Sequence, residues 1–495
     1  MKRYAILAGL AFVILASAAV WLGGLNQDEG WYLYAARMVG EGKMPYRDFF
    51  FTQGPLLPVV YAKLAWLWSP FGVLGGRILT CLIGLLSIVL AAGAVRYVVP
   101  REKRNLAATV VLFLLGCNLY HVYYTSIPKT YALASLLVAF GFAQLALAFS
   151  DFGGRHLRLR PVLLFASGLG FAYATGARIS LGALLAVTGF TLLFTFRRTR
   201  WSFLWFGLGG VLGLSVVYGP FLCDPVAREG LIAAQRYHAA RGGFDPVFTV
   251  GSVSRLVRWY LPVFVTLGLG IPAWRRNGRP GSVALTAAVL GVVAVFVVQM
   301  LAPFPYEDYN VPVMGLLAVI AAALFVGTEI RPKALLVLGM TWACSFGSPL
   351  LEDWTTDGQD IFWTLKKSQC ELAQLRQAAK FVEAIDPGGK TLLTQDTYLA
   401  VETERKVPDG LEMGPFSMLT DEEWRELLST CEAPVAALSG YTFAIEPPRC
   451  DERPFAVQRA YWEILRGRYD LVMREEAFGQ NATTLLLLKR KESGE

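Results

Sequence analysis

Charged residues are scarce in this sequence of 495 residues: Asp, Glu, Lys and Arg make up 17% of it, whereas hydrophobic residues make up 55% and the mean hydropathy is +0.45. This composition excludes a soluble enzyme of ordinary type, and it also excludes disordered, collagen-like and disulfide-scaffolded chains. Histidine is rarer still, with three residues, and no spacing of His and Cys resembles a zinc site. The sequence therefore identifies no cofactor and no metal ligands, and it leaves a bound divalent metal ion open.

The few charges are divided unevenly along the chain. Of 46 basic and 38 acidic residues in all, 17 and 26 fall within 350–495, which leaves 29 basic and 12 acidic residues for 1–349. A basic, apolar block therefore precedes an acidic, more polar one. The basic residues of the first block stand in short clusters between apolar runs and not along one face, which is typical of membrane proteins and excludes nucleic acid as a partner.

The first block contains about eleven apolar runs, each close to the roughly 20 residues that a helix needs to cross a bilayer. They cover 4–25, 74–99, 105–125, 130–149, 161–177, 180–196, 202–222, 257–274, 282–300, 310–328 and 333–349. The sequence thus predicts a polytopic α-helical membrane module over 1–349 and a separate domain over 350–495. The first run begins with basic residues, as a secretory signal does. Its apolar part is longer than a signal core, so we expect an uncleaved first helix.

Basic clusters fall in alternate connections, and the positive-inside rule makes these connections cytoplasmic. The clusters are Lys2 and Arg3; Arg101, Lys103 and Arg104; Arg155, Arg158 and Arg160; Arg197, Arg198 and Arg200; Arg275, Arg276 and Arg279; and Arg331 and Lys333. They place the N-terminus in the cytoplasm and, with an odd number of spans, the 350–495 domain on the external, periplasmic side of the inner membrane. The external side also holds the long connections 26–73 and 223–256. The inner connections are short and contain no phosphate-binding loop, so chemistry is expected on the external face.

The first external connection opens with two carboxylates, Asp28 and Glu29, directly after the first span. Apolar and aromatic residues then recur at helical spacing, which predicts an amphipathic helix along the membrane surface. Asp28 has two compatible readings: it is a helix N-cap, or it is a base held above the bilayer that takes a proton from an acceptor hydroxyl. A second surface helix is expected after Pro55, with Trp66 and Trp68 as interfacial anchors.

Cations also occur on the external side, where the positive-inside rule leaves few of them. Arg178 lies between two apolar runs at an external span end, where a charge is costly unless it faces a polar cavity or a phosphate. Snorkelling to the lipid headgroups is the alternative. The 223–256 connection carries further cations, among them Arg236, His238 and Arg241. This concentration indicates a lipid phosphate as ligand or, equally, nonspecific headgroup contact.

Several segments together resemble the GT-C membrane glycosyltransferases, in particular the branch that includes protein O-mannosyltransferases and the aminoarabinose transferase of lipid A. The matching segments are Asp28-Glu29, Pro45-Tyr46-Arg47-Asp48, Gly54-Pro55-Leu56, GFAYATGARISL at 170–181 and PYEDYNVPVMGLLAVIAAALF at 305–325. The resemblance covers most of 1–349. It places Arg178 at the basic position that ends a glycine-rich helix in the family.

The resemblance implies an inverting transfer of a sugar from a polyprenyl-phosphate donor to a hydroxyl of a lipid, polysaccharide or protein acceptor, in contact with membrane lipids. It implies Asp28 as the general base, with Glu29 or Asp48 orienting donor or acceptor. The candidates for binding the donor phosphate are Arg178, Lys129, Arg236 and Arg241. The candidates for other substrate contacts are Tyr46, Arg47, Gln53, His238 and Tyr306.

Two departures from the family pattern affect these assignments. The family often has Lys-Pro-Pro where this sequence has Gln53-Gly54-Pro55, so a lysine that meets the donor phosphate is missing there. The connection between spans three and four often carries an acid, whereas this one carries Lys129. Phosphate recognition is therefore expected at Lys129, at Arg178 or in the 223–256 connection. The connection before span four supplies no second catalytic carboxylate.

The 350–495 block alternates helical and strand patterns, which predicts a small α/β domain that covers the site or selects the acceptor. Helices are expected at 370–385, 421–430 and 454–467, and short buried strands at 390–394, 433–438, 469–473 and 483–489. The block contains no nucleophile, metal or phosphate motif. Asp396, which follows a predicted strand, is expected to be a solvated loop residue. Cys370, Cys431 and Cys450 permit one disulfide, whose pairing the sequence does not decide.

A polytopic transporter, or a flippase for lipid-linked sugars without transferase activity, is the competing class. Transporters commonly contain internal repeats and ionisable residues at mid-membrane, and this sequence shows neither a repeat nor a mid-span acid. The long first external connection and the external domain favour an enzyme. An inactive scaffold in envelope assembly is a third reading, and such a protein would tolerate the loss of Asp28.

Overall fold

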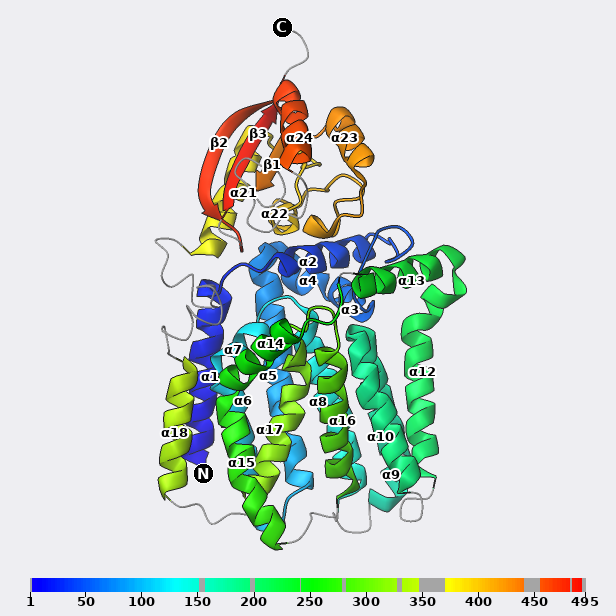
Figure 1. The fold of residues 1–495 in the computed structure, drawn as a ribbon, viewed down its shortest axis with the longest axis vertical. Coiled ribbons are helices and arrows are strands. Elements are labelled where there is room, and N and C mark those ends of the chain that lie inside the picture. The colour runs from blue at the N-terminus through cyan, green and yellow to red at the C-terminus, as the bar shows by residue number, and fades with distance from the viewer. Residues whose placement is uncertain are drawn as a thin grey trace.

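The computed structural model describes residues 2–150, 156–195, 201–240, 242–277, 282–326, 332–346, 370–439, 455–480 and 483–491. Within them the chain forms a bundle of long helices with a smaller domain of helices and strands stacked on one end (Figure 1). The N-terminus lies at the opposite end of the bundle from this C-terminal domain. The predicted boundary at residue 349 and the cysteine at 450 lie outside the described residues.

Within the described residues, each predicted span corresponds to a helix of the bundle. These helices are α1 (Lys2–Leu22), α5 (Gly72–Ala94), α6 (Arg104–Gly116), α8 (Thr130–Ala148), α9 (His156–Ala177), α10 (Gly182–Phe194), α12 (Ser202–Cys223), α15 (Leu261–Asn277), α16 (Val283–Met300), α17 (Val311–Phe325) and α18 (Pro332–Phe346). Six helical stretches in this part of the chain are long and apolar enough to cross a membrane, and shorter apolar helices accompany them. The predicted polytopic helical membrane protein is confirmed.

The third predicted span, 105–125, is not one continuous helix. α6 ends at Gly116, and the chain starts a new short helix, α7 (Leu119–Tyr124), after Asn118. The Asn118 side chain accepts a hydrogen bond from the backbone N–H of His121 at 2.9 Å, as an N-cap residue does, and donates one to the Trp259 carbonyl at 2.8 Å. This break lets the chain turn ahead of Lys129, which directly precedes α8.

Glycines bring the backbones of α9 and α12 into contact. A Cβ atom at Gly168 would lie 2.0 Å from the carbonyl oxygen of Phe206, and one at Gly209 would lie 2.0 Å from that of Phe165. Small residues have this role in membrane helices, where association depends on close packing. The tight pair fixes the end of α9, and Arg178 follows directly after it.

A group of short helices lies at the end of the bundle that carries the C-terminal domain (Figure 1). It contains α2 (Gln27–Gly40), α3 (Leu56–Lys63), α4 (Ala65–Trp68), α13 (Pro225–Ala240) and α14 (Pro246–Trp259), with the 3-10 turns η1 (Ser69–Phe71), η4 (Ile179–Leu181) and η5 (Glu307–Asn310). Two further turns follow α5, η2 (Val95–Tyr97) and η3 (Arg101–Lys103). α2 lies across the ends of the bundle helices (Figure 1). The helix predicted after Asp28 is confirmed, but it is largely buried and not an open surface helix, because the C-terminal domain packs on it.

The second predicted surface helix is interrupted, and one of its two tryptophans is no interfacial anchor. α3 ends at Lys63, and α4 is a single turn. Trp66 is 73% exposed and fits a membrane anchor, whereas Trp68 is 2% exposed and donates its indole N–H to the Tyr61 carbonyl at 2.9 Å. A buried indole needs such an acceptor, so Trp68 is a packing residue.

The C-terminal domain contains an antiparallel three-stranded sheet with strand order β1-β3-β2. Its elements are α21 (Glu371–Ile385), α22 (Thr397–Glu402), η6 (Gly414–Phe416), α23 (Asp421–Thr430), β1 (Val435–Ser439), α24 (Phe455–Arg468), β2 (Tyr469–Phe478) and β3 (Thr483–Arg490). The expected helices and three expected strands are confirmed. The segment 390–394 is not a strand of this sheet, since Thr391 and Leu393 form only isolated bridges, to Lys406 and Ala436.

Candidate functional site

α2 begins with a capping box that leaves the Asp28 side chain free for another role. Asn26 is the N-cap: its Oδ1 accepts the N–H of Asp28 at 3.1 Å, and Glu29 Oε1 accepts the N–H of Asn26 at 2.9 Å. The reading of Asp28 as the N-cap is therefore wrong. Its carboxylate lies in the first turn, where the helix dipole favours negative charge, and accepts the indole N–H of Trp31 at 3.2 Å.

Glu29 is fully buried against Arg77. Its two carboxylate oxygens accept hydrogen bonds from Nε and Nη2 of Arg77, each at 2.7 Å, and neither side chain is exposed. The guanidinium also donates to the carbonyls of Val20, Gly23 and Gly24 at 2.9 to 3.0 Å. This pair ties the end of α1 and the start of α2 to α5. The structure therefore places Glu29 where a substrate has no access to it.

Lys129 joins Asp28 to a second carboxylate, Asp308. Lys129 Nζ lies 2.9 Å from Asp28 Oδ2 and 3.3 Å from Asp308 Oδ2. Tyr131 donates a hydrogen bond to the same oxygen of Asp308 at 2.8 Å. The side chains of Lys129 and Asp308 are 8% and 11% exposed, whereas that of Asp28 is 27% exposed. Asp28 is thus the carboxylate of this group that is most open to a ligand.

Lys129 is held in its charged form although it is buried. Burial lowers the pKa of its ammonium, but the charges of Asp28 and Asp308 outweigh this effect and hold the pKa well above its usual value. The rings of Tyr124 and Tyr131 also face the ammonium, with centroids 5.5 and 5.3 Å away. Lys129 therefore acts as a fixed positive charge between two acids.

Arg178 is a second buried cation beside this group, and in the described part of the chain it has no carboxylate partner. It is 9% exposed, and its guanidinium carbon lies 4.3 Å from the ring centroid of Tyr309 and 5.0 Å from that of Tyr131. Its hydrogen bond to Thr130 Oγ1 is long, at 3.4 Å. Snorkelling does not describe this position, because the side chain points into the protein. Hereafter the Asp28 cluster means Asp28, Lys129, Tyr131, Arg178 and Asp308.

Asp308, like Tyr131, is a site residue that the sequence did not single out. It lies in η5, one residue after Glu307, whose carboxylate pairs with Arg255 of α14 at 3.1 Å. Its partner Lys129 is 179 residues away in the chain. The signal in the sequence was an acid at the external end of a span, within the segment 305–325 that resembles the family. Asp308 is thus a second carboxylate beside Lys129, contributed by a segment far from Asp28 in the sequence.

Asp48 and Arg47 form a separate, more exposed group. Arg47 Nη2 lies 2.9 Å from Asp48 Oδ2, and Arg47 Nη1 lies 3.7 Å from Asp224 at the end of α12. The hydrogen bond from Arg47, followed by that from the backbone N–H of Met44, lowers the pKa of Asp48. Among the described residues, no hydrogen bond or ion pair joins Asp48 to the Asp28 cluster. Sequence reasoning placed the two acids in one catalytic set.

Tyr46 and Gln53 hold the first connection in shape. The backbone of Tyr46 has a φ of 67°, which is uncommon for residues other than Gly, Asn or Asp. The Tyr46 hydroxyl donates a hydrogen bond to the Gln53 carbonyl. Its ring meets that of Phe221 edge to face, with centroids 5.3 Å apart. Tyr46 is 5% exposed and Gln53 is half-buried. The structure gives both residues intramolecular contacts that shape the loop.

The other predicted contacts differ in where the structure places them. Arg236 is exposed on α13. Arg241 and the side chain of His238 lie outside the described residues. Tyr306 is 41% exposed, and its ring centroid lies 5.6 Å from that of Tyr309, the ring that covers Arg178. Tyr306 therefore reaches the Asp28 cluster only through the ring of Tyr309.

The C-terminal domain packs directly on α2 and so on the segment that carries Asp28. A Cβ atom at Gly30 would lie 2.2 Å from the backbone nitrogen of Tyr398, so only glycine permits this approach of α22. Further hydrogen bonds join the two parts: Leu25 N–H to Glu371 Oε2 at 2.5 Å, Gln27 N–H to Gln480 Oε1 at 2.9 Å and Val407 N–H to Tyr34 Oη at 2.9 Å. The domain thus holds α2 on both sides of Asp28.

No group of three or more His, Cys, Asp and Glu side chains suited to a metal ion occurs among the residues that the structure describes. The two acids that approach each other, Asp28 and Asp308, share the ammonium of Lys129.

Comparison with known proteins places this geometry in a known fold. No protein-family model and no curated protein sequence matches the chain. Among solved structures, ArnT from Cupriavidus metallidurans in the apo state superposes with a TM-score of 0.69 over 98% of both chains, at 14% identity. The same protein bound to undecaprenyl phosphate gives a TM-score of 0.69 at 15% identity, again over 98% of both chains. The chain has the GT-C fold.

A more distant GT-C structure agrees with this result. The apo oligosaccharyltransferase of Archaeoglobus fulgidus gives a TM-score of 0.54 at 10% identity, over 96% of this chain and 73% of the other. At these low identities, the TM-scores and coverages establish a shared overall fold. The GT-C resemblance that the first connection suggested is confirmed for the fold.

Proposed function

We propose that this GT-C protein is an inverting glycosyltransferase that moves a sugar from a polyprenyl-phosphate donor to an acceptor hydroxyl. The observation that carries the proposal is the Asp28 cluster at the end of an apolar helix bundle. In it a buried ammonium holds a partly open carboxylate, beside a buried guanidinium that has no carboxylate partner among the described residues. An ArnT of this fold binds undecaprenyl phosphate, which supports a lipid phosphate as the donor's carrier.

Asp28 is the proposed general base. The hydrogen bond from Trp31 and the contact with Lys129 fix its carboxylate, and its exposure leaves room for an acceptor hydroxyl. As the hydroxyl oxygen forms a bond to the anomeric carbon, Asp28 takes the hydroxyl proton, and the bond from the anomeric carbon to the phosphate oxygen breaks. The bonding electrons leave with the polyprenyl phosphate, so no general acid is needed.

Arg178 is the proposed main ligand of the donor phosphate. Its guanidinium is buried and stacked between tyrosine rings, and its few hydrogen bonds leave donors for phosphate oxygens. Lys129 already has two carboxylate partners and contributes its charge as the phosphate departs. Arg236 and Arg241 then have the lesser role of attracting the anionic lipid.

The remaining predicted residues take supporting roles in this proposal. Glu29 is a positioning residue, which acts through Arg77 on the start of α2. Arg47 and Asp48, with Tyr46, Gln53 and Tyr306, border the acceptor side. The proposed setting is the inner membrane with the N-terminus in the cytoplasm, so the Asp28 cluster and the C-terminal domain face the periplasm.

The test is release of free polyprenyl phosphate from a panel of labelled polyprenyl-phosphate sugars by the purified protein in lipid, with candidate lipid, polysaccharide and peptide acceptors. Asp28→Asn is expected to reduce release by about 10²- to 10⁴-fold, the usual contribution of a general base. Glu41→Gln, an exposed acid at the other end of α2, is the matched control and is expected to retain activity.

Thermal unfolding of each variant separates a chemical defect from a folding defect. Equal release by wild type and a folded Asp28→Asn variant would contradict Asp28 as the base and direct attention to Asp48. Absence of turnover by wild type with every donor would contradict the transferase and favour a transporter or a flippase for lipid-linked sugars.

A further inference from the structure

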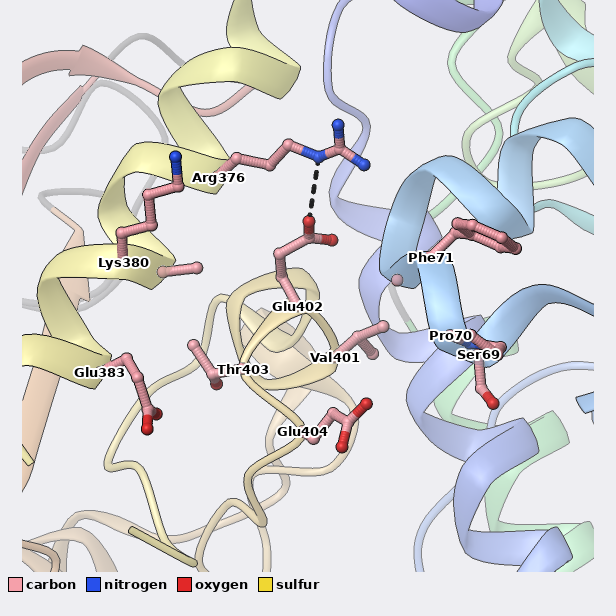
Figure 2. A pocket seen from close by; sticks show the side chains of 12 residues that line it. Ser69, Pro70, Phe71, Arg376, Lys380, Glu383, Val401, Glu402, Thr403 and Glu404 are labelled. Carbon is pink, nitrogen blue, oxygen red and sulfur yellow. Dashed lines mark hydrogen bonds and ion pairs between the residues drawn. The ribbon is translucent and has the colours of Figure 1, made fainter. Parts of the chain in front are cut away.

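A cavity of about 600 Å³ lies between the bundle and the C-terminal domain, bounded by α21, by the end of α22 and by the turn that leads into α5. Figure 2 shows Arg376 and Lys380 projecting from α21 on one side and Phe71 on the bundle side, with Glu402 and Glu404 on the α22 side. Its volume is within the range of small-ligand sites, which often form at domain boundaries. None of these residues belongs to the Asp28 cluster.

One ion pair in the cavity has a structural role. Glu402 accepts the N–H of Val73, at the start of α5, at 3.0 Å and pairs with Arg376 of α21 at 3.2 Å. A Cβ atom at Gly72 would lie 2.2 Å from the same carboxylate, so the glycine lets it reach the α5 backbone. Glu402 therefore joins the two walls of the cavity and sets their spacing.

Lys380 and Glu404 are two opposite charges in the cavity. Neither side chain has a hydrogen-bond or ion-pair partner in the described part of the chain. Glu404 has a φ of 54°, a conformation that favours glycine, so the protein keeps a carboxylate at a strained position. Outliers of this kind concentrate at ligand sites. Both side chains are exposed and lie on opposite sides of the cavity in Figure 2, so a ligand that meets both charges must span it.

The surroundings of the cavity place it at the level of lipid headgroups. Phe71, on its rim, is 59% exposed, and Trp66 of the preceding short helix α4 is 73% exposed, as expected for aromatic residues at a membrane interface. Below them α5 presents one exposed apolar face along its length. This face consists of Ile78, Leu82, Leu86 and Val89, which are 44 to 58% exposed. We infer that this stripe faces lipid and that the cavity, which begins at the turn before α5, lies at the level of the headgroups.

We propose that this cavity binds the zwitterionic headgroup of a membrane phospholipid, with Lys380 on the phosphate and Glu404 on the ammonium. The apolar face of α5 receives the acyl chains of the same lipid. The bound lipid bridges the bundle and the C-terminal domain beside Glu402. This lipid site is independent of the proposed transfer reaction, because its residues and its ligand are different.

The test measures which lipids the full-length protein retains. Protein reconstituted in vesicles of equal parts phosphatidylethanolamine and phosphatidylglycerol is extracted in mild detergent, and bound lipid is counted by native mass spectrometry. We expect wild type to retain phosphatidylethanolamine over phosphatidylglycerol by about fivefold, the ratio that one exposed charge pair supplies. Equal retention of the two lipids would overturn the proposal.

Two variants locate the binding in the cavity. Lys380→Glu removes the phosphate partner, and Glu404→Gly removes the ammonium partner while relieving the backbone strain, so the second variant is expected to unfold at a higher temperature and yet lose the lipid preference. Lys390→Glu makes the same charge change at an exposed lysine outside the cavity and is expected to keep the preference. A preference that survives in both cavity variants would place the lipid elsewhere and refute the assignment.

A competition with free glycerophosphoethanolamine separates the two sources of this headgroup chemistry. The lipid assignment expects the free headgroup to displace retained phosphatidylethanolamine only weakly, because it lacks the acyl chains that contact α5. Tight binding of the free headgroup without retention of the lipid would show a soluble ligand and overturn the lipid assignment.

Discussion

Alanine at Gly30 is expected to separate the C-terminal domain from the helix that carries Asp28. The added Cβ atom would lie 2.2 Å from the backbone nitrogen of Tyr398 and 2.8 and 2.9 Å from two atoms of Thr397. Two of these three are backbone atoms, so no side-chain rotation relieves the contact. α2 and α22 must move apart by about 1 Å, from 2.2 Å to the 3.4 Å at which ordinary contact begins.

The energetic cost follows from this displacement. Overpacking of a tight contact costs about 1 to 3 kcal/mol, and the higher helix propensity of alanine returns up to about 1 kcal/mol. We expect a net loss of about 1 to 2 kcal/mol in the free energy of unfolding. A shift of about 1 Å at a reacting group can cost about 10²-fold in rate, so sugar transfer should fall by up to that factor.

Gly40→Ala is the matched control, because it makes the same change at the other end of α2. The nearest atom to a Cβ there is the Ala62 side chain, at 4.0 Å, so the variant should be as stable as wild type or slightly more stable and fully active. Hydrogen exchange of the amides in α2 and α22 measures the contact, and polyprenyl phosphate release measures the reaction. If Gly30→Ala matches Gly40→Ala in both measurements, the C-terminal domain does not position Asp28.

Three further outcomes follow from the buried charges. Burial raises the pKa of Asp396 to about 6, so the folded state favours the protonated acid, and the free energy of unfolding should fall as the pH rises from about 4 to 6 and stay low above pH 6. Asp396→Asn should remove this decline and add up to about 3 kcal/mol to the free energy of unfolding at pH 7. Thermal unfolding of both proteins across this pH range measures the effect. Arg77→Met should lower the free energy of unfolding by about 3 to 5 kcal/mol, because it leaves Glu29 buried without a partner, and adding Glu29→Leu should recover most of this loss. A single variant as stable as wild type would contradict a buried ion pair. Arg178→Lys keeps the charge but loses the planar guanidinium, so the release of polyprenyl phosphate should fall about 10-fold, and Arg178→Gln should lower it by about 10²-fold or more. If both variants release it at the wild-type rate, Arg178 does not bind the donor phosphate.

The bundle was predictable because hydropathy alone decides which segments cross a membrane. The burial of α2 was not, since the aromatic face that reads as membrane-facing is covered by a domain hundreds of residues later in the chain. The same limit explains Asp396, which is 6% exposed and not a solvated loop residue. Its burial and its hydrogen bond from Tyr398 arise from tertiary packing, which a local pattern does not contain.

At the site, adjacent residues of one helix proved to have different partners. Asp28 and Glu29 are both acidic and adjacent in the sequence, but successive residues of a helix point about 100° apart. Asp28 therefore pairs with Lys129, and Glu29 pairs with Arg77. A signal for Glu29 was present: an arginine inside an apolar span requires a buried acid, and Arg77 lies in the span 74–99. Asp308 carried a weaker signal, because its contact with Lys129 spans 179 residues.

The charge balance of the Asp28 cluster explains why a lysine lies between two acids. Before the proposed reaction, Asp28 and Asp308 together neutralise Lys129 and Arg178, and the donor phosphate carries one charge. Proton transfer neutralises the Asp28 carboxylate beside Lys129, while the departing phosphate gains a second negative charge. The net charge of the site is unchanged, and the ammonium of Lys129 becomes available to the phosphate at the moment when the phosphate needs it. Asp308 keeps Lys129 charged and in place throughout, which accounts for a second acid that need not touch the substrate.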